Sequence, residues 1–403
     1  MSFSFPVDFI SEGMANIVIP NLSAFKRGPW DYAPSRAPVF YNPLMKPCRD
    51  VAVLVLQSYQ SYVNRDLKVS EPLAGCGVRG IRFAKEVKGV NTVYINDINE
   101  RAYELAKYNV QLNNLNEKVF VSNEDACLFL SRHAAPAQRF DFIDIDPFGS
   151  PAPYIDSAVR ALRDGGLLAL TATDLASLCG VYPKVALRKY GGSSLKTEYA
   201  QEIAVRLLAG CLANIAAKHD IGVKILFSHV AKHCVRLYAL IEYGAKKADR
   251  SLDSMGYLLH CFKCFHREAV QGILSLNSSS RCPECGSPLR VAGPLWLREI
   301  VDKEFFTVIE ENMKSVKHID DEVIKLISLI KEETDAPITY YVTDKICEKI
   351  KAPTPPIRKV INNIKDMGFR ASRTHFHSKG IKTDAPSSIV IEAVKKAIKR
   401  RNQ

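Results

Sequence analysis

The segment Glu71-Pro72-Leu73-Ala74-Gly75-Cys76-Gly77-Val78-Arg79-Gly80 decides the fold of this chain. It follows a stretch, residues 68–71, that is typical of a β-strand, and it opens a helix predicted over residues 81–88. Glycines at such a junction let the backbone approach a ligand at the N-terminus of the helix. The pattern alone fits several nucleotide-containing ligands, so the residues around it must identify the ligand.

Short apolar runs alternate with longer amphipathic stretches from about residue 50 to residue 244. Such alternation is typical of a parallel sheet that is covered by helices. Two of the predicted helices span residues 81–88 and 100–112, and Asp164-Gly165-Gly166 marks a turn into the fifth strand. The predicted strands are residues 68–71, 91–96, 118–122, 140–144, 166–172 and 224–229. The fold class is therefore α/β, with a doubly wound, Rossmann-like sheet.

Three features at the ends of these strands favour S-adenosylmethionine over a nicotinamide or flavin cofactor. Asp97 ends the second strand, where a carboxylate accepts hydrogen bonds from ribose hydroxyls in either class of enzyme. Asp125 and the small Ala126 end the third strand, where methyltransferases hold the adenine amine and one face of the ring. The loop at residues 146–149 closes the fourth strand and has no obvious use in hydride transfer. We therefore predict a class I methyltransferase domain.

Four more residues are candidates for contact with this cofactor. The backbone at Gly75 and Gly77 can approach it closely because glycine has no side chain. Arg49 and Arg79 are candidates for the carboxylate of its methionine moiety, since a guanidinium forms bidentate pairs with carboxylates. A surface ion pair is the alternative for each arginine.

The loop Asp146-Pro147-Phe148-Gly149 is the predicted catalytic element. An amine on a nucleobase is a poor nucleophile, because its lone pair is delocalised into the ring. We expect Asp146 to accept a hydrogen bond from the amine, to help remove its proton and to align it with the sulfonium methyl. Pro147 would fix the turn and offer its carbonyl as a second acceptor, and Phe148 would stack on an extruded base. The alternative is a plain turn at the end of a strand.

Other polar residues have less certain places near this loop. Asp141 is expected to cap the strand, and Asp144 is expected to be satisfied by backbone amides. The remaining candidates for the same edge, with the base or the RNA backbone as partner, are Glu198, Glu202, His233 and Arg236.

An N-terminal arm, residues 1–48, precedes the methyltransferase domain that we place at residues 49–244. Two interpretations of the arm stay open, since it could lie over the ligand-binding edge of the sheet or simply pack against the domain. Its proline and aromatic residues include Pro29, Trp30, Tyr32, Pro34, Pro38, Phe40, Tyr41 and Pro43.

The 403-residue chain carries 55 Lys and Arg residues against 43 Asp and Glu residues, which gives a net charge of +12. Positive charge attracts polyanions, so RNA or DNA is the natural partner, although a basic balance can also merely aid solubility.

No apolar run approaches the roughly 20 residues of a membrane-spanning helix, and the chain does not begin with a secretion signal. We expect a cytoplasmic protein with no membrane contact and no obligate protein partner.

Four of the eleven cysteines form two knuckles, Cys261-Phe262-Lys263-Cys264 and Cys282-Pro283-Glu284-Cys285. This spacing suits tetrahedral Zn²⁺, and four thiolates close its coordination shell, so the predicted zinc site is structural. Free thiols or disulfides are the alternatives. His260 and His266 flank the first knuckle and are expected to lie outside the ligand set.

A C-terminal domain is predicted over residues 245–403, with the zinc site at residues 261–285. Helices are expected over residues 297–312, 320–333, 343–349 and 355–367, followed by polar or strand-like segments at 369–376 and 380–383. Helices followed by a β-ribbon are similar to a winged-helix module, here at about residues 320–390. The basic tail, residues 395–401, either contacts nucleic acid or is a solvated end.

With these residues in hand, the chain resembles the tRNA guanine-N2 dimethyltransferase family, which methylates guanosine 26 between the D-arm and the anticodon arm. The match runs nearly end to end. The segments that carry it are Glu12-Gly13, Phe40-Tyr41-Asn42-Pro43, Arg49-Asp50, residues 77–83 (GVRGIRF), Asn96-Asp97, residues 146–151 (DPFGSP), Arg188-Lys189-Tyr190-Gly191, residues 372–376 (SRTHF) and Lys382-Thr383-Asp384-Ala385.

The resemblance implies a role for each site residue. Contact with the cofactor is implied for Arg49, Arg79, Asp97, Asp125 and Ala126, and Phe40 would lie near the cofactor or the target base. Asp146 would be catalytic, and the four clustered cysteines would bind zinc. One departure is that Cys48 stands where the family usually has Asn before the Arg-Asp pair.

The predicted function is S-adenosylmethionine-dependent mono- and dimethylation of the exocyclic N2 of guanosine 26 in tRNA. One alternative is an amine methyltransferase that acts on DNA or ribosomal RNA, which should lack the segment at residues 373–376. The other is a non-catalytic zinc-containing RNA-binding protein, against which the presence of Asp97 and Asp146 speaks.

Overall fold

The computed structural model describes residues 3–26, 28, 34–231, 234–272 and 280–399. Several residues singled out above lie outside the described residues, namely Pro29, Trp30, Tyr32, His233, Arg400 and Arg401.

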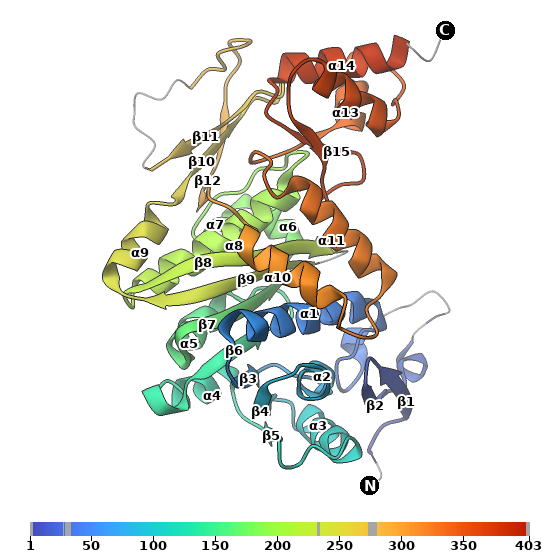
Figure 1. Cartoon of the computed structure of the whole chain (residues 1–403), viewed down its shortest axis with the longest axis vertical. Helices are drawn as coiled ribbons and strands as arrows, with labels where there is room; N and C mark the ends of the chain where they lie inside the picture. Colours follow the sequence, from blue (N-terminus) through green and yellow to red (C-terminus); the bar gives the residue numbers. More distant parts are fainter. Residues whose placement is uncertain (1–2, 27, 29–33, 232–233, 273–279, 400–403) are drawn as a thin grey trace.

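A seven-stranded mixed sheet forms the centre of the molecule (Figure 1). Its strand order is β5-β4-β3-β6-β7-β9-β8, and the strands from β5 to β7 are parallel. The bounds are β3 (Leu67–Glu71), β4 (Val90–Asn96), β5 (Val119–Ser122), β6 (Phe140–Ile145), β7 (Leu162–Ala172), β8 (Ile221–Ala231) and β9 (Cys234–Tyr243). The order reverses beside β3, so the edge where β3, β4 and β6 end is the expected ligand-binding edge of a Rossmann-like sheet.

All six predicted strands are present, and the sheet is mixed rather than parallel throughout. Strand β9 was not predicted, and it lies antiparallel between β7 and β8. A local pattern of apolar residues does not tell which neighbours a strand will pair with, so this insertion left no signal in the sequence. The predicted turn at residues 164–166 lies inside β7, at an irregularity where the pairing with β6 shifts from Leu162 to Leu167.

Helices cover both faces of the sheet because neighbouring residues of the strands point to opposite sides. Phe142 and Leu167 belong to one core, whereas Ile143 and Leu168 belong to the other. The first face is covered by α1 (Lys46–Val63), α2 (Val78–Glu86) and α3 (Glu100–Leu112), and the second by α4 (Ala126–Arg132), α5 (Ile155–Ala161) and α8 (Ala200–Ala217). Within the described residues, α8 alone has the length and hydropathy of a membrane-crossing helix, and it is mostly buried in the second core.

The shorter elements lie at the edges of the sheet. Between β7 and α8 the chain forms α6 (Leu175–Leu178) and α7 (Pro183–Tyr190), and α9 (Ala245–Leu252) follows β9. Short 3-10 turns occur at Leu22–Phe25, Pro34–Arg36, Pro43–Met45, Pro136–Gln138 and Ala152–Tyr154.

The N-terminal arm begins as an antiparallel hairpin of β1 (Val7–Glu12) and β2 (Ala15–Pro20). Two asparagines of α3 hold it through the backbone of β2. The side chain of Asn109 accepts from the amide of Val18 at 2.7 Å, and the side chain of Asn113 donates to the carbonyl of Asn16 at 2.6 Å. The hairpin therefore packs against the helical layer.

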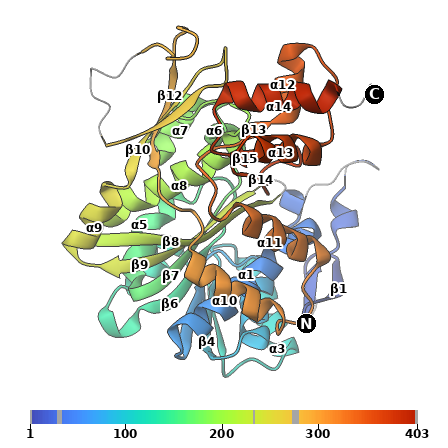
Figure 2. The same ribbon diagram turned by 45° about the horizontal axis from the view of Figure 1, so that its top comes forward.

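Two helices from the C-terminal half complete the first core. Both α10 (Lys303–Met313) and α11 (Asp321–Glu333) pack against α1 (Figure 2). Phe305 contacts Tyr62 edge to face, with ring centroids 5.8 Å apart. Residues from Val301 to Ile330 thus share one hydrophobic core with strands made from residues 67–169.

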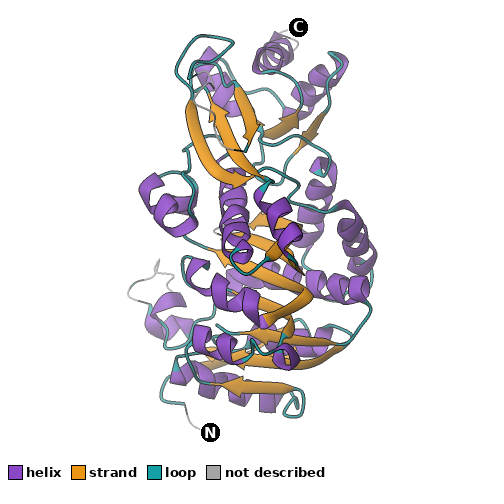
Figure 3. Ribbon diagram, turned by 90° about the vertical axis from the view of Figure 1, so that its left-hand side faces the viewer, coloured by secondary structure: helices purple, strands orange, loops and turns teal. Residues whose placement is uncertain are grey.

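The remaining C-terminal elements form two small sheets (Figure 3). The first has the order β11-β10-β12, from β10 (Met255–His260), β11 (Arg267–Gln271) and β12 (Arg290–Trp296). The second has the order β13-β15-β14 and is accompanied by three helices, with the bounds β13 (Tyr341–Val342), α12 (Thr343–Ile350), α13 (Ile357–Asp366), β14 (Ala371–Arg373), β15 (Gly380–Thr383) and α14 (Ser387–Lys399).

The predictions for this half were right about most elements and less accurate about their bounds. The helix expected from residue 297 begins at Lys303, where Asp302 accepts from the amide of Phe305 as the N-cap. The strand-like segment expected over residues 369–376 forms a strand only over residues 371–373. The two-residue strand β13 was not predicted.

Candidate active site

The loop at residues 146–149 lies where β6 ends, at the ligand-binding edge of the sheet. Asp146 is partly exposed, Pro147 is buried and Phe148 is 68% exposed. Thr173, at the end of β7, fixes the turn, because its hydroxyl accepts from the amide of Gly149 at 2.8 Å and its amide donates to the Gly149 carbonyl at 2.9 Å. The loop therefore presents an acid and an aromatic ring to solvent on a fixed backbone.

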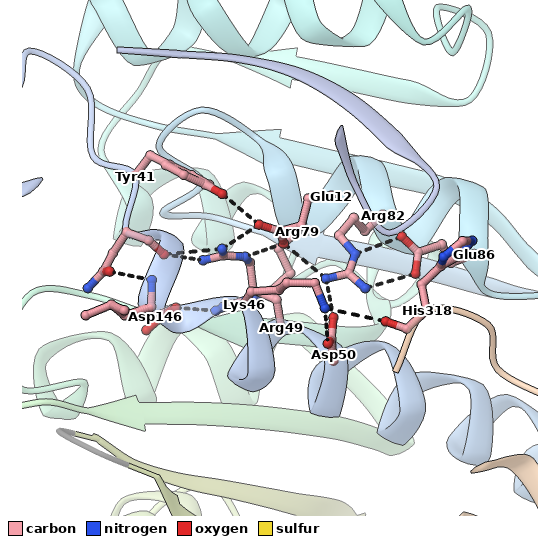
Figure 4. Close-up of polar contacts among 12 residues, drawn as sticks. Glu12, Tyr41, Lys46, Arg49, Asp50, Arg79, Arg82, Glu86, Asp146 and His318 are labelled. Atoms are coloured by element: carbon pink, nitrogen blue, oxygen red, sulfur yellow. Dashed lines mark hydrogen bonds and ion pairs between the residues drawn. The ribbon is translucent and has the colours of Figure 1, made fainter. Parts of the chain in front are cut away.

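Two arginines surround the carboxylate of Asp146. The guanidinium of Arg79, at the start of α2, makes a short charge-assisted hydrogen bond to it (Figure 4). Arg236 of β9 lies 4.0 Å away. Burial raises the pKa of Asp146, but the charges of Arg79 and then Arg236 outweigh burial, so the pKa is lowered and the group is a carboxylate at neutral pH.

Asp144 is satisfied by the same two arginines, so the prediction that backbone amides would satisfy it was wrong. Its carboxylate accepts from Arg79 at 3.1 Å and from Arg236 at 2.8 Å, and all three side chains are buried. A fully buried carboxylate needs a charged partner, and two guanidinium groups supply it. Asp141 lies at the opposite end of β6 and pairs with Arg65 and Arg163 there.

Two aromatic rings lie side by side above this edge. Phe40 and Phe148 meet edge to face with centroids 4.6 Å apart, and Phe40 is 37% exposed. Phe40 also lies against the glycine turn, since a Cβ at Gly75 would lie 3.0 Å from the Phe40 carbonyl oxygen. Asn99, beside Asp97, donates to the carbonyl of Pro38 at 2.8 Å. In the described residues of the arm, the part near Phe40 therefore lies over the ligand-binding edge.

The predicted cofactor residues lie at the ends of β3, β4 and β5. Gly75 and Gly77 have positive φ angles of 55° and 76°, which favour glycine. The Gly75 amide donates to Asp97 at 2.8 Å, and desolvation raises the pKa of that carboxyl. Asp125 is exposed and caps α4 by accepting from the amide of Leu128 at 3.0 Å, and Ala126 is buried behind it.

Arg49 is held by Glu12 of the hairpin, a contact that the sequence did not indicate (Figure 4). The guanidinium forms two hydrogen bonds of 2.6 Å to that carboxylate, and it also donates to the carbonyl of Asn42 at 3.2 Å. Arg82 adds a second charge at 3.0 Å from Glu12. Burial raises the pKa of Glu12, but the two arginines lower it to about 2. Arg49 and Arg79 are thus both paired with carboxylates of the chain, and their contact with a methionine carboxylate stays a prediction.

Glu71 is a buried acid for which the sequence predicted no role. It ends β3, where its carboxyl accepts from the amide of Gly80 at 2.8 Å. Burial raises its pKa to about 8, which Arg79 lowers only in part. The group is therefore protonated at neutral pH, and this side chain helps to fix the start of α2.

We expect Glu71→Gln to change the pH dependence of stability. The pKa of Glu71 is about 8 in the fold and 4.5 in its ordinary state. Wild-type stability that is complete below pH 4.5 should fall as the pH rises through 8, because the unfolded chain ionises first. Glutamine does not titrate, so the variant should match the wild type at pH 5 and exceed it by about 2–5 kcal/mol at pH 9. Urea unfolding at both pH values measures this, and a constant difference would contradict it.

The other acids proposed for the catalytic edge bind the C-terminal half instead. Glu198 pairs with Arg267 at 2.5 Å, and Glu202 pairs with Lys382 at 2.9 Å. Of the three candidates that lie within the described residues, Arg236 reaches the Asp146 loop. The sequence signal for this contact is the Lys382-Thr383-Asp384-Ala385 segment, whose structural role was not predicted.

The four clustered cysteines lie together between β10 and β12. Their sulfur atoms are all within 4.8 Å of one another, with Cys261 3.5 Å from Cys285 and Cys264 3.4 Å from Cys282. Zinc–sulfur bonds of about 2.3 Å in a tetrahedron separate the sulfurs by about 3.8 Å, so the residues fit this ion. His260 is buried and contacts the Tyr199 hydroxyl at 3.1 Å, and His266 contacts Glu284. Both histidines have partners of their own, outside the group of four sulfurs.

The similarity to known proteins extends over nearly the whole chain. The family model of N2,N2-dimethylguanosine tRNA methyltransferases matches residues 13–395. A tRNA (guanine(26)-N(2))-dimethyltransferase from Methanobrevibacter smithii is 39% identical over 97% of this chain and 98% of the relative. A tRNA (guanine(26)-N(2)/guanine(27)-N(2))-dimethyltransferase from Aquifex aeolicus is 35% identical over 94% of this chain and 93% of the relative.

A solved structure is similar in both fold and sequence. Trm1 from Pyrococcus horikoshii, in complex with S-adenosyl-L-methionine, has a TM-score of 0.83 and 33% identity, and the match covers 96% of this chain and 99% of that one. The family match, the sequence identities and the fold all extend across both halves of the molecule. The chain therefore belongs to the N2,N2-dimethylguanosine tRNA methyltransferase family.

Proposed function

We propose that this protein transfers methyl groups from S-adenosylmethionine to the exocyclic N2 of guanosine 26 in tRNA, once or twice. The observation that carries the proposal is the carboxylate of Asp146, which lies at the ligand-binding edge beside the Phe40–Phe148 pair. The names of the relatives support the choice of substrate.

The residues at the glycine turn suit the proposed cofactor. Asp97 offers acceptors for ribose hydroxyls, and Asp125 offers one for the adenine amine, with Ala126 against the ring. Gly75 and Gly77 keep the turn free of side chains, and Arg49 and Arg79 would share their guanidinium groups with the methionine carboxylate. When bound, the cofactor supplies an electrophilic methyl group on a sulfonium.

The Asp146 loop would activate the amine. The carboxylate accepts a hydrogen bond from the guanine amine and thereby holds it for in-line attack. After transfer the nitrogen carries an extra proton, which Asp146 helps to remove. Phe148 would stack on the extruded base with Phe40 beside it, because N2 cannot reach the donor from inside a stacked helix.

We propose that the C-terminal half, residues 245–403, grips the tRNA. The order of elements from α11 to β15 is helix, strand, helix, helix, strand, strand, which is similar to a winged-helix module. Arg358, Lys359 and Lys365 are exposed on α13, where they could pair with phosphates.

We also propose that the four cysteines hold one structural Zn²⁺. The second knuckle contacts α14, because Ser387 donates to Glu284 at 2.7 Å. Phe265, directly after the first knuckle, contacts α12, because Lys349 lies 4.6 Å from its ring. The ion would therefore hold the small β10–β12 sheet against the winged-helix-like part.

We expect Cys282→Ser to lose zinc and to loosen this region. The variant should bind less than one zinc per chain and should be cut faster by protease near residues 261–290, since three ligands hold the ion less tightly than four. Metal analysis and limited proteolysis measure both effects. Cys127→Ser, a single cysteine far from the cluster in the sequence, is the control. Equal metal content in both variants would contradict the site.

One experiment tests the proposed function. The protein is incubated with unmodified tRNA and labelled S-adenosylmethionine, and the modified nucleoside is then mapped. Labelled N2-methyl- and N2,N2-dimethylguanosine at position 26 is the expected result. Label at position 27 as well would indicate the two-position specificity that the name of the Aquifex relative gives. Transfer to DNA or ribosomal RNA alone, or no transfer at all, would refute the proposal.

A further inference from the structure

The turn before α7 and one side of α7 expose large apolar and basic side chains. Val181, Tyr182 and Leu187 are 47%, 57% and 53% exposed. Lys184 and Arg188 are also exposed, and positions 184, 187 and 188 are neighbours on one side of a helix. We call these five residues the α7 face. Large apolar side chains that are exposed within one short segment are typical of a binding surface.

The backbone that carries the α7 face is fixed. Gly180 has a φ of 83°, and a Cβ there would lie 2.4 Å from the carbonyl carbon of Leu195, so the turn packs tightly against that segment. The amides of Val181 and Tyr182 both donate to the carbonyl of Ala176, at 2.9 and 3.2 Å. Little conformational entropy of the backbone at Tyr182 is therefore lost when a partner binds there.

The opposite side of α7 ties the face to the catalytic loop. Tyr190 is buried, and its hydroxyl donates to Asp174 at 2.5 Å. Ser150, which follows the loop, is a second hydrogen-bond neighbour of that hydroxyl. Asp174 directly follows Thr173, which holds Gly149. Tyr190 thus connects α7 to residues on both sides of the turn that fixes the catalytic loop.

The charge of the α7 face favours a polyanion. In the part of the chain that the structure describes, neither Lys184 nor Arg188 forms an ion pair with a carboxylate. Each cation is therefore available to a phosphate, and the whole chain is basic, with a net charge of +12. Exposed aromatic and aliphatic groups between cations suit RNA, whose unstacked bases pack on such side chains.

We propose that the α7 face is an RNA wedge, which contacts the nucleotides next to the target guanosine and stabilises the tRNA with that base extruded. This rests on the proposed function. Tyr182 and Leu187 pack on the neighbouring bases, which lose a stacking partner when the target base is extruded. Lys184 and Arg188 bind the flanking phosphates. Extrusion of a base costs a few kcal/mol, and stacking on one aromatic side chain returns about 1–3 kcal/mol, so the two are comparable.

The test compares Tyr182→Ala with the wild type on two tRNAs. On intact tRNA the variant should lose about 10–100-fold in kcat/KM, which corresponds to the stacking energy of one base. The second tRNA has an abasic site opposite the target guanosine, which lowers the cost of extrusion. On it the two proteins should differ by less than threefold. Cofactor binding should be unchanged.

A matched control is Phe120→Ala, which removes a similarly exposed ring, 45% accessible, from the edge strand β5. It should match the wild type on both tRNAs. Lys184→Gln together with Arg188→Gln should raise KM at constant kcat and reduce the salt dependence of tRNA binding by about one to two phosphate contacts.

Three results would overturn the wedge. These are full activity of Tyr182→Ala on intact tRNA, an equal loss on both tRNAs, and an unchanged salt dependence in the double variant. If the wild type methylates no tRNA, the proposed function fails instead. Gel-shift binding of the wild type and the double variant to unmodified tRNA at several salt concentrations would then still decide whether the α7 face contacts RNA.

Discussion

Asp146→Ala should lower kcat for methyl transfer to tRNA by about 10²–10⁴-fold, the range that general acid–base groups contribute. The variant removes the acceptor that holds the amine and the group that takes its proton. Cofactor binding should stay largely intact, because the residues of the glycine turn are not changed. Single-turnover methylation and a calorimetric titration with the cofactor measure the two effects. Full activity would refute the role of the carboxylate.

Two further variants show which property of Asp146 matters. Asp146→Asn keeps an acceptor oxygen but cannot take a proton, so a smaller loss than in the alanine variant would assign the difference to positioning. Asp141→Ala is the matched control, since this acid lies on the same strand at the opposite end and pairs with Arg65 and Arg163. It should lower stability without changing kcat.

Glu202→Gln should destabilise the whole protein by about 3–5 kcal/mol, a large part of the stability of an ordinary domain. Its carboxylate is buried between Arg206 at 2.8 Å and Lys382 at 2.9 Å. Without it two buried cations face each other. Urea unfolding at pH 7 measures the loss. The pKa of Glu202 is lowered to about 2, chiefly by Lys382 and Arg206 against burial, so its contribution is complete above pH 4.5 and fades as the pH falls toward 2.

Lys382→Met should cost less than Glu202→Gln, because Arg206 still pairs with the carboxylate. The double variant should be more stable than the sum of the two single losses predicts. Lys345→Met is the control, since Lys345 forms a surface ion pair with the exposed Glu348. Surface pairs add little to stability, so no measurable change is expected. Losses of the same size in Lys345→Met and Glu202→Gln would contradict the argument from burial.

Much of the fold could be predicted because its signals are local. The strands near residues 70, 95, 121 and 142 are short apolar runs bounded by turns, and the glycine turn and the acids that follow these strands mark the ligand-binding edge. The two cysteine knuckles are local as well. For the same reason Asp97 and Asp146 directly follow their strands as predicted, whereas Asp125 lies three residues beyond the end of β5 and caps α4.

The contacts that shape the site could not be predicted, because they join residues far apart in the sequence. Arg236 lies on a strand inserted antiparallel into the sheet, and it reaches Asp144 across 92 positions. Glu12 holds Arg49 through a hairpin that packs on α3. Charge pairs of this kind depend on tertiary packing and leave no periodic pattern.

The packing of α10 and α11 on α1 has a consequence for synthesis of the protein. When the ribosome has made residue 244, all seven strands of the sheet have been synthesised. Helix α1, which covers one face of the sheet, is then still without α10 and α11, which pack on its other side. That cover is complete only near residue 330, on the order of 5–15 s later at ordinary translation speeds. During this interval the nascent chain exposes an apolar helix, and chaperones and aggregation compete for it. The second half of the polypeptide is therefore expected to shield an apolar helix of the first half only after it has been synthesised.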